Sequence, residues 1–279
     1  ASDMAAYDAA DASGHRAELL TVLRRHLTAA KHTIEQDFLA THDGAVYVGQ
    51  HARCIDALLH LLRDEACKII PQSDAIAVIA VGGYGRGEMA PFSDIDVMFL
   101  MPAKTSKKHE AAIEFMLYLL WDLGLKIGHS TRSITEAINA GRDDQTVMTS
   151  FLEMRLVCGD AALWTKLSDA MRLEIAKNKP LVFVEEKLAE RDLRHKRFGD
   201  TRYVVEPNVK DGKGGLRDLH SLFWIAKYAY RADSIMDVLA QGVLRDAEGR
   251  RFASAQRCLW TGRCHLHLHA GRAEERLDF

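Results

Sequence analysis

Apolar residues recur every three or four positions along most of this chain, a spacing that places them on one face of an α-helix. Residues 15–39 and 46–70 both show it, and the turn at 42–44 between them predicts an antiparallel helical hairpin. The pattern then changes to two short apolar runs, 75–82 and 94–101, which predict neighbouring β-strands.

Beyond residue 101 the helical spacing returns, with one further strand. Residues 108–123 predict a helix that ends at Gly124, and residues 125–132 predict a third strand. The remaining predicted helices span 133–140, 144–157, 160–177, 180–199, 215–231, 233–241 and 245–275. The fold class is therefore α+β, with a small mixed sheet and flanking helices followed by an all-helical region.

Because no strand is predicted after residue 132, we expect a domain boundary near 135–145. Residues 1–14, rich in Ala, Asp and Ser, predict a disordered tail. Residues 15–140 form the predicted sheet domain with its helical hairpin, and residues 141–279 form the predicted helical domain, which ends within an unfinished helical pattern.

The first candidate for chemistry is the pair Asp94 and Asp96 at the start of the second strand. Alternate residues of a strand share a face, so both carboxylates point the same way while Ile95 points into the core. Two carboxylates on one face suit Mg²⁺ or Mn²⁺, which prefer oxygen ligands. The alternative is a solvated strand end.

Glycines lie beside these carboxylates, at Gly82 and Gly83 after the first strand. Glycine lets backbone N–H groups approach a phosphate because no Cβ intervenes. The alternative is a simple turn. The loop is neither a P-loop nor the G-x-G-x-x-G of dinucleotide binding. Together, the glycines and the carboxylates predict nucleotide transfer from a nucleoside triphosphate.

A second polar cluster spans residues 206–218, a glycine-rich loop that opens a helix. It offers Lys210, Lys213 and Arg217, cations that can neutralise a triphosphate. The carboxylate half of the chain is short of cations, so we expect Lys213 or Arg217 to face Asp94 and Asp96 across a cleft. The alternative is a solvated connector.

Composition argues against several other classes of protein. The formal net charge of −2 gives no bulk attraction to nucleic acid or membranes, and the sequence lacks a run of about 18 apolar residues. The five cysteines are scattered without a C-x-x-C pair, which favours buried thiols in a reducing, cytoplasmic compartment. The triplet His265, His267 and His269 predicts a surface helix rather than a metal site, because only the first and last share a face.

The glycine–carboxylate spacing resembles the nucleotidyltransferase superfamily of DNA polymerase β type. The longer string VGGYGRGEMAPFSDIDVMFL (81–100) is similar to the family of bacterial PII uridylyltransferase/uridylyl-removing enzymes. The same resemblance extends to GLKIGHSTRS (124–133), MTSFLEMRLVCGD (148–160) and EPNVKDGKGGLRDLHSLFWIAK (206–227). It covers the chain from about residue 15 to its end.

The resemblance implies a nitrogen-regulating enzyme that moves UMP from UTP to a tyrosine of the PII signalling protein and releases pyrophosphate. It implies Mg²⁺ or Mn²⁺ at Asp94 and Asp96, and triphosphate binding by Gly82 and Gly83, with Arg86 and Ser93 in support. The HD and ACT domains of that family, which remove UMP and bind glutamine, have no counterpart in these 279 residues. We therefore interpret the chain as a fragment of such an enzyme.

One departure from the superfamily keeps alternatives open. A third carboxylate is expected on the next strand, but residues 125–132 contain neither Asp nor Glu. His129 is one candidate base for the attacking hydroxyl. A protein adenylyltransferase of the glutamine synthetase-modifying type is an alternative function, as is a degenerate module that senses nucleotide without turnover.

Overall fold

The computed structural model describes residues 12–177, 180–201, 203–232 and 234–278. Its strands are β1 (Ala77–Ala80), β2 (Ile95–Leu100), β3 (Ile127–Arg132) and β4 (Arg155–Gly159). Its helices are α2 (Ala12–Thr41), α3 (Gly44–Ile69), α4 (Gly82–Gly85), α5 (Lys107–Asp122), α6 (Ile134–Asp143), α7 (Gln145–Phe151), α8 (Ala161–Lys177), α9 (Pro180–Arg197), α10 (Leu216–Tyr230), α11 (Ile235–Ala240) and α12 (Asp246–Ala270). The α+β class predicted from the sequence is confirmed.

The four strands form one mixed sheet in the order β3-β2-β1-β4. β1 pairs antiparallel with both β2 and β4, and β2 pairs parallel with β3. The strand that follows the glycine loop therefore lies directly beside the strand that precedes it. This pairing holds the glycines and the carboxylates at the same end of the sheet.

The prediction of a helix over 144–157 is wrong in its second half. That helix ends at Phe151, and residues 155–159 form β4, an edge strand of the sheet. The apolar residues of so short an edge strand fit the spacing of a helix equally well. Pairing with β1 determines that they form a strand. The sheet thus continues past residue 140, and the two-domain organisation remains a prediction.

The tail prediction also changes at its end. Residues 12–14 belong to α2, while the predicted tail residues 1–11 lie outside the described residues. Among the described residues, no helix combines the length and the apolar character needed to cross a membrane.

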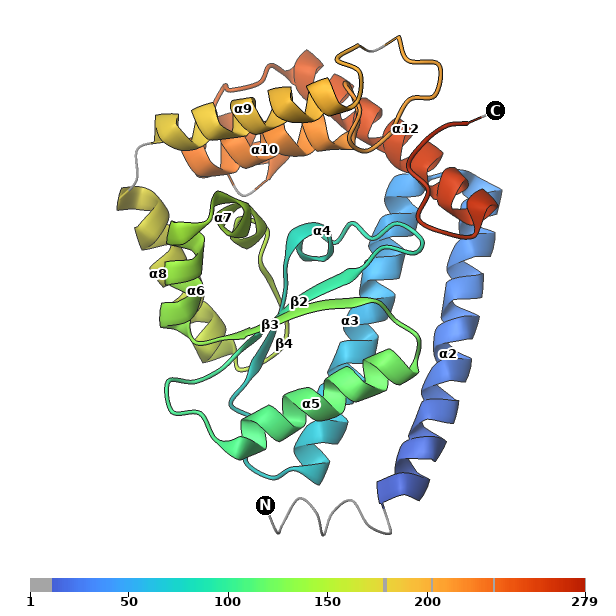
Figure 1. Cartoon of the computed structure of the whole chain (residues 1–279), viewed down its shortest axis with the longest axis vertical. Coiled ribbons are helices and arrows are strands. Elements are labelled where there is room, and N and C mark those ends of the chain that lie inside the picture. The colour runs from blue at the N-terminus through green and yellow to red at the C-terminus, as the bar shows by residue number, and fades with distance from the viewer. Residues whose placement is uncertain (1–11, 178–179, 202, 233, 279) are drawn as a thin grey trace.

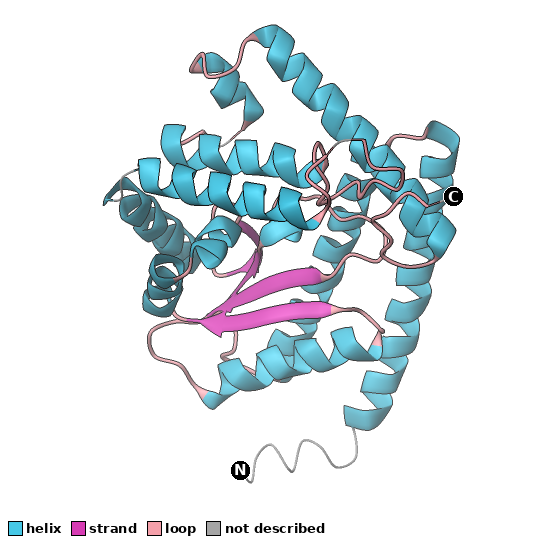
Figure 2. Ribbon diagram, turned by 45° about the horizontal axis from the view of Figure 1, so that its top comes forward, coloured by secondary structure: helices cyan, strands magenta, loops and turns pink. Residues whose placement is uncertain are grey.

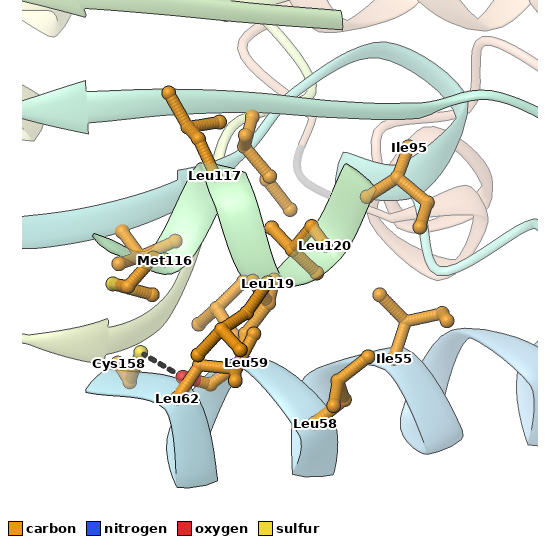
Figure 3. Packing of buried hydrophobic residues seen from close by; sticks show 14 of the residues in the cluster. Ile55, Leu58, Leu59, Leu62, Ile95, Met116, Leu117, Leu119, Leu120 and Cys158 are labelled. Atoms are coloured by element: carbon orange, nitrogen blue, oxygen red, sulfur yellow. Dashed lines mark hydrogen bonds between the residues drawn. The ribbon is translucent and has the colours of Figure 1, made fainter. Parts of the chain in front are cut away.

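Helices cover both faces of the sheet, so alternate residues of β1 enter different clusters. Val78 and Ala80 pack with α3 and α5, whereas Ala77 and Ile79 pack with residues of α7, α8 and α10. Figure 3 shows the first cluster, where leucines of α3 and α5 interdigitate and the Cys158 thiol donates to the Leu59 carbonyl at 3.8 Å.

The alternation also places Asp96. On β2, Val97 and Phe99 face the α3 and α5 side, whereas Met98 and Leu100 face the other side. Asp96 shares the face of Met98, and over that face the chain lays α7, α9 and α10 (Figures 1 and 2). The carboxylates therefore point toward the later helices.

The last long helix, α12, returns to the hairpin that begins the fold and packs against α3 (Figure 1). Their contact is closest at Gly44, where an added Cβ would lie 2.3 Å from the Thr261 nitrogen and 2.4 Å from the Trp260 carbonyl carbon. Gly44 N–H also donates to the Thr261 hydroxyl at 3.0 Å. Only a residue without a side chain fits there.

We expect Gly44→Ala to lower the free energy of unfolding by about 1–3 kcal/mol, because the methyl group meets backbone that cannot move aside. Gly49→Ala is the matched control in the same helix, since its Cβ would meet only the end of the Arg53 side chain at 3.4 Å. That control should be neutral or stabilising by about 0.5–1 kcal/mol. Urea denaturation measures both, and equal effects would contradict the close packing of α3 on α12.

Candidate active site

A cavity of about 830 Å³ opens between the end of the sheet and the later helices. It is lined by α4, the loop that follows it, the start of β2, helices α7, α9, α10 and α12, and the segment around Glu275. Among its lining residues are these predicted site residues: Gly82, Gly83, Arg86, Ser93, Asp94, Asp96 and Arg217.

Asp94 and Asp96 lie together in this cavity, as their spacing predicted. Burial, followed by the negative charge of Asp94, raises the pKa of Asp96 above its ordinary value of 3.8, while Lys210 acts in the opposite direction. The two carboxylates therefore repel each other. A divalent cation between them would relieve that repulsion, so this donor set fits Mg²⁺ or Mn²⁺.

The protein offers such a cation two carboxylate ligands, Asp94 and Asp96. In the part of the chain that the structure describes, no group of three or more His, Cys, Asp or Glu residues is arranged so that it could hold a metal ion. A cation held here would complete its coordination with phosphate oxygens and water, which is the usual pattern for Mg²⁺.

The glycine loop approaches the same carboxylates through its backbone. Gly82 has a φ of +56°, which favours glycine, and a Cβ there would lie 3.6 Å from Asp96 Oδ2. Val81 N–H donates to the Asp96 carbonyl at 3.0 Å, which fixes the loop to β2. Gly82 and Gly83 begin the single turn of α4, where backbone N–H groups have no partner within the helix.

Arg86, predicted to support the triphosphate, is committed to two carboxylates of the protein. Its guanidinium bonds to Glu88 at 2.6 Å and to Glu153 at 2.5 Å, and its side chain is 11% exposed. Glu153 comes from the turn before β4, so the pair ties the glycine loop to the edge of the sheet. In this structure Arg86 organises the loop rather than offering a free cation.

The same two carboxylates reach the later helices. Trp224 of α10 donates its indole N–H to Glu153 at 2.5 Å, and His220 Nε2 lies 3.3 Å from Glu88. Burial opposes ionisation of Glu88, but His220 and Arg86 lower its pKa to about 2. Burial and the charge of Arg86 lower the pKa of His220 to about 4. We call these five residues the arginine cluster.

Lys210 is the cation that faces Asp96 from the 206–218 loop. It lines the cavity, and its charge lowers the pKa of Asp96. Burial, and then the charge of Arg263, lower the pKa of Lys210 itself. Its ammonium lies 3.6 Å from Glu275, which Arg263 of α12 contacts with two bonds, at 2.6 and 2.8 Å.

The other two cations of the loop have different positions. Arg217 lines the carboxylate cavity and lies 3.5 Å from Asp211. Lys213 lines a neighbouring cavity of about 450 Å³ and lies 3.2 Å from Asp200. The loop thus brings Lys210 and Arg217, but not Lys213, to the lining of the carboxylate cavity.

β3, the strand expected to carry a third carboxylate, has a glycine beside Asp96. Gly128 pairs with Asp96, and a Cβ on Gly128 would lie 2.4 Å from Asp96 Oδ1. A side chain at that position would therefore displace the Asp96 carboxylate. His129 pairs with Val97, on the face of the sheet opposite to Asp96. The centroid of its ring lies 5.9 Å from that of Trp121, so His129 points away from the cavity.

The histidine triplet of α12 contains one buried member, so the surface-helix prediction is wrong for His267. This ring has no exposed surface, its Nδ1–H donates to the Pro91 carbonyl, and its Nε2 lies 3.5 Å from Glu275. Sequence reasoning missed His267, Glu153 and Glu275 because each acts through a partner distant in sequence. Glu153 and His220 did lie within the strings that carried the family resemblance.

Two family models match parts of the chain that contain these residues. Residues 59–155 match the family described as nucleotidyltransferase domain, and residues 182–279 match the family described as GlnD PII-uridylyltransferase. The first match contains the glycine loop and both carboxylates. The second contains Lys210, Arg217 and the α10 members of the arginine cluster.

The chain is also similar to proteins named bifunctional uridylyltransferase/uridylyl-removing enzyme. It is 46% identical to the one from Rhodospirillum rubrum and 44% identical to the one from Azospirillum brasilense, in each case over 95% of this chain and 29% of the relative. Identity to the one from Ruegeria pomeroyi is 43%, over 99% of this chain and 31% of the relative. The chain thus contains a region that matches a nucleotidyltransferase domain, and it is similar to a segment that spans under a third of the length of these bifunctional uridylyltransferase/uridylyl-removing enzymes.

Proposed function

We propose that this chain transfers UMP from UTP to a tyrosine hydroxyl of the PII signalling protein and releases pyrophosphate. The observation that carries the proposal is the cavity that places the Gly82–Gly83 backbone, both carboxylates and Lys210 around one space. The names of the relatives support UMP as the transferred group.

In this reaction the tyrosine hydroxyl gives its proton to water, and its oxygen bonds to the α-phosphorus of UTP as the bond to the pyrophosphate oxygen breaks. Asp94 and Asp96 would hold Mg²⁺ or Mn²⁺, which supplies positive charge at the reacting phosphate. The N–H groups of Gly82 and Gly83 bind phosphate oxygens, and Ser93 lines the same space. Lys210 and Arg217 neutralise the charge that gathers on the departing pyrophosphate.

The arginine cluster supports this chemistry without taking part in it. Because Arg86 is already paired with Glu88 and Glu153, it fixes the loop that presents the glycines. Preorganised donors cost little reorganisation when charge develops in the transition state.

The setting that fits this function is the cytoplasm, where UTP and a reduced thiol pool are both available. The five cysteines of the chain are all free thiols in the structure. We infer UTP and PII as the partners, with no role for nucleic acid.

Asp96→Asn should reduce the rate of UMP transfer at least about 100-fold, because it removes a charge that acts on the reacting phosphate. The same change should raise stability at pH 7. Because folding raises the pKa of Asp96, the folded state disfavours the ionised carboxylate. The free energy of unfolding therefore falls as pH rises through that pKa. The amide carries no such penalty.

Labelled UTP with PII measures the rate, and thermal melting at several pH values measures stability. The stability advantage of Asp96→Asn should vanish once the pH falls below the ordinary carboxylate pKa of 3.8. Full transfer activity in this variant at saturating Mg²⁺ would falsify the assignment. Faster transfer from ATP than from UTP would instead favour the adenylyltransferase alternative.

Lys210→Ala should raise the KM for UTP by about tenfold, since one charge-assisted contact to phosphate is lost. The matched comparison is Lys213→Ala, which removes a cation of the same loop from the neighbouring cavity and should change KM less. Steady-state kinetics at low and high salt measures both, and the Lys210 effect should shrink as salt rises. A larger effect at Lys213 would show that the loop closes differently around UTP.

A further inference from the structure

Phe92 is an exposed aromatic residue in an otherwise polar part of the cavity. Its side chain is 47% exposed, and it belongs to none of the hydrophobic clusters of the described residues. Of the other rings on the cavity lining, Tyr84, Trp224 and Trp260 are at most 4% exposed, His220 is buried and Phe198 is partly exposed. Phe92 therefore offers the cavity a ring face that the protein core does not use.

The backbone at Phe92 is unusual for so large a residue. Ala90, Pro91, Phe92 and Ser93 form a turn that is closed by Ser93 N–H donating to the Ala90 carbonyl at 3.2 Å. Proline occupies the second position and Phe92 the third, with a φ of +59°. This matches a type II turn, whose third position favours glycine. A bulky side chain there is a rare exception and costs roughly 1–2 kcal/mol.

The surrounding structure holds this unfavourable turn in place. The buried ring of His267 donates Nδ1–H to the Pro91 carbonyl at the centre of the turn. His267 is in turn held near Glu275, the carboxylate that also contacts Lys210. The backbone of the turn that carries Phe92 is thus held by residues that also contact Lys210. Strain that is maintained in this way is often associated with function.

We propose that Phe92 is the stacking surface for the uracil ring of UTP, an inference that rests on the proposed function. The glycine backbone, the carboxylates and the cations all serve the phosphate end of the nucleotide, which leaves its base to be held by an apolar surface. Phe92 is two residues from Asp94, so their Cα atoms lie within about 7 Å. A base joined through one sugar to a phosphate near Asp94 can reach that ring.

The occupant is the base rather than the acceptor tyrosine. A protein acceptor brings its own surface to surround its tyrosine, whereas a nucleotide depends on the enzyme for every contact. An exposed ring carried on a constrained turn suits a small planar group, and base stacking on an aromatic side chain contributes about 1–3 kcal/mol.

The test compares binding of UTP and of inorganic triphosphate to the chain in Mg²⁺, without PII, by calorimetry. Phe92→Leu should weaken UTP binding roughly fivefold to a hundredfold, which is the stacking range converted to affinity. It should leave triphosphate binding unchanged, since that probe has no base. Phe92→Tyr should keep UTP affinity, and Tyr118→Leu, which removes an aromatic residue 50% exposed on α5, should have no effect.

Phe92→Gly separates this role from a structural one. It relieves the positive φ, so the melting temperature should rise while UTP affinity falls. Equal loss of both probes in Phe92→Leu would overturn the inference, because Phe92 would then only shape the loop. Unchanged UTP affinity together with a raised KM for PII would assign the ring to the acceptor and also overturn it. A wild-type chain that bound neither probe would overturn the proposed function as well.

Discussion

The arrangement of the candidate site depends on one buried ion pair network, in which Arg86 lies between Glu88 and Glu153. These residues come from the glycine loop and from the turn before β4, and they bind Trp224 and His220 of α10. Buried charges are costly unless each is paired and hydrogen-bonded, so the elements that supply the partners must stay together. This network links α10 to the glycine loop and to the turn before β4, which line the cavity.

A second polar network fixes the other wall of the cavity. Glu275 lies close to Arg263, His267 and Lys210. Burial raises the pKa of Glu275, but these three partners lower it further, to a final value of about 2. The segment that carries Glu275 is itself held by backbone bonds, since Val209 N–H donates to the Glu275 carbonyl at 2.8 Å and Leu277 N–H to the Pro207 carbonyl at 3.1 Å. The loop that offers Lys210 is therefore positioned by residues from the far end of the chain.

The cations of the two networks differ in how closely the carboxylates of the protein hold them. Arg86 and Arg263 make short bonds to carboxylates of the protein, whereas Lys210 and Arg217 lie farther from theirs, at 3.6 Å from Glu275 and 3.5 Å from Asp211, and line the cavity. Gly128 contributes by lacking a side chain, because only then can Asp96 occupy the space above β3.

The α+β class, the helical hairpin, the strands that flank the glycine loop and the shared face of Asp94 and Asp96 could all be predicted from the sequence. These features depend on the periods of helix and strand, which are local properties. Four outcomes required the folded structure: residues 155–159 pair with β1, His129 points away, Lys210 rather than Lys213 lines the carboxylate cavity, and Arg86 is bound internally. The physical reason is that each of these outcomes depends on a partner brought close by folding, and the sequence pattern around a residue carries no information about a partner a hundred positions away.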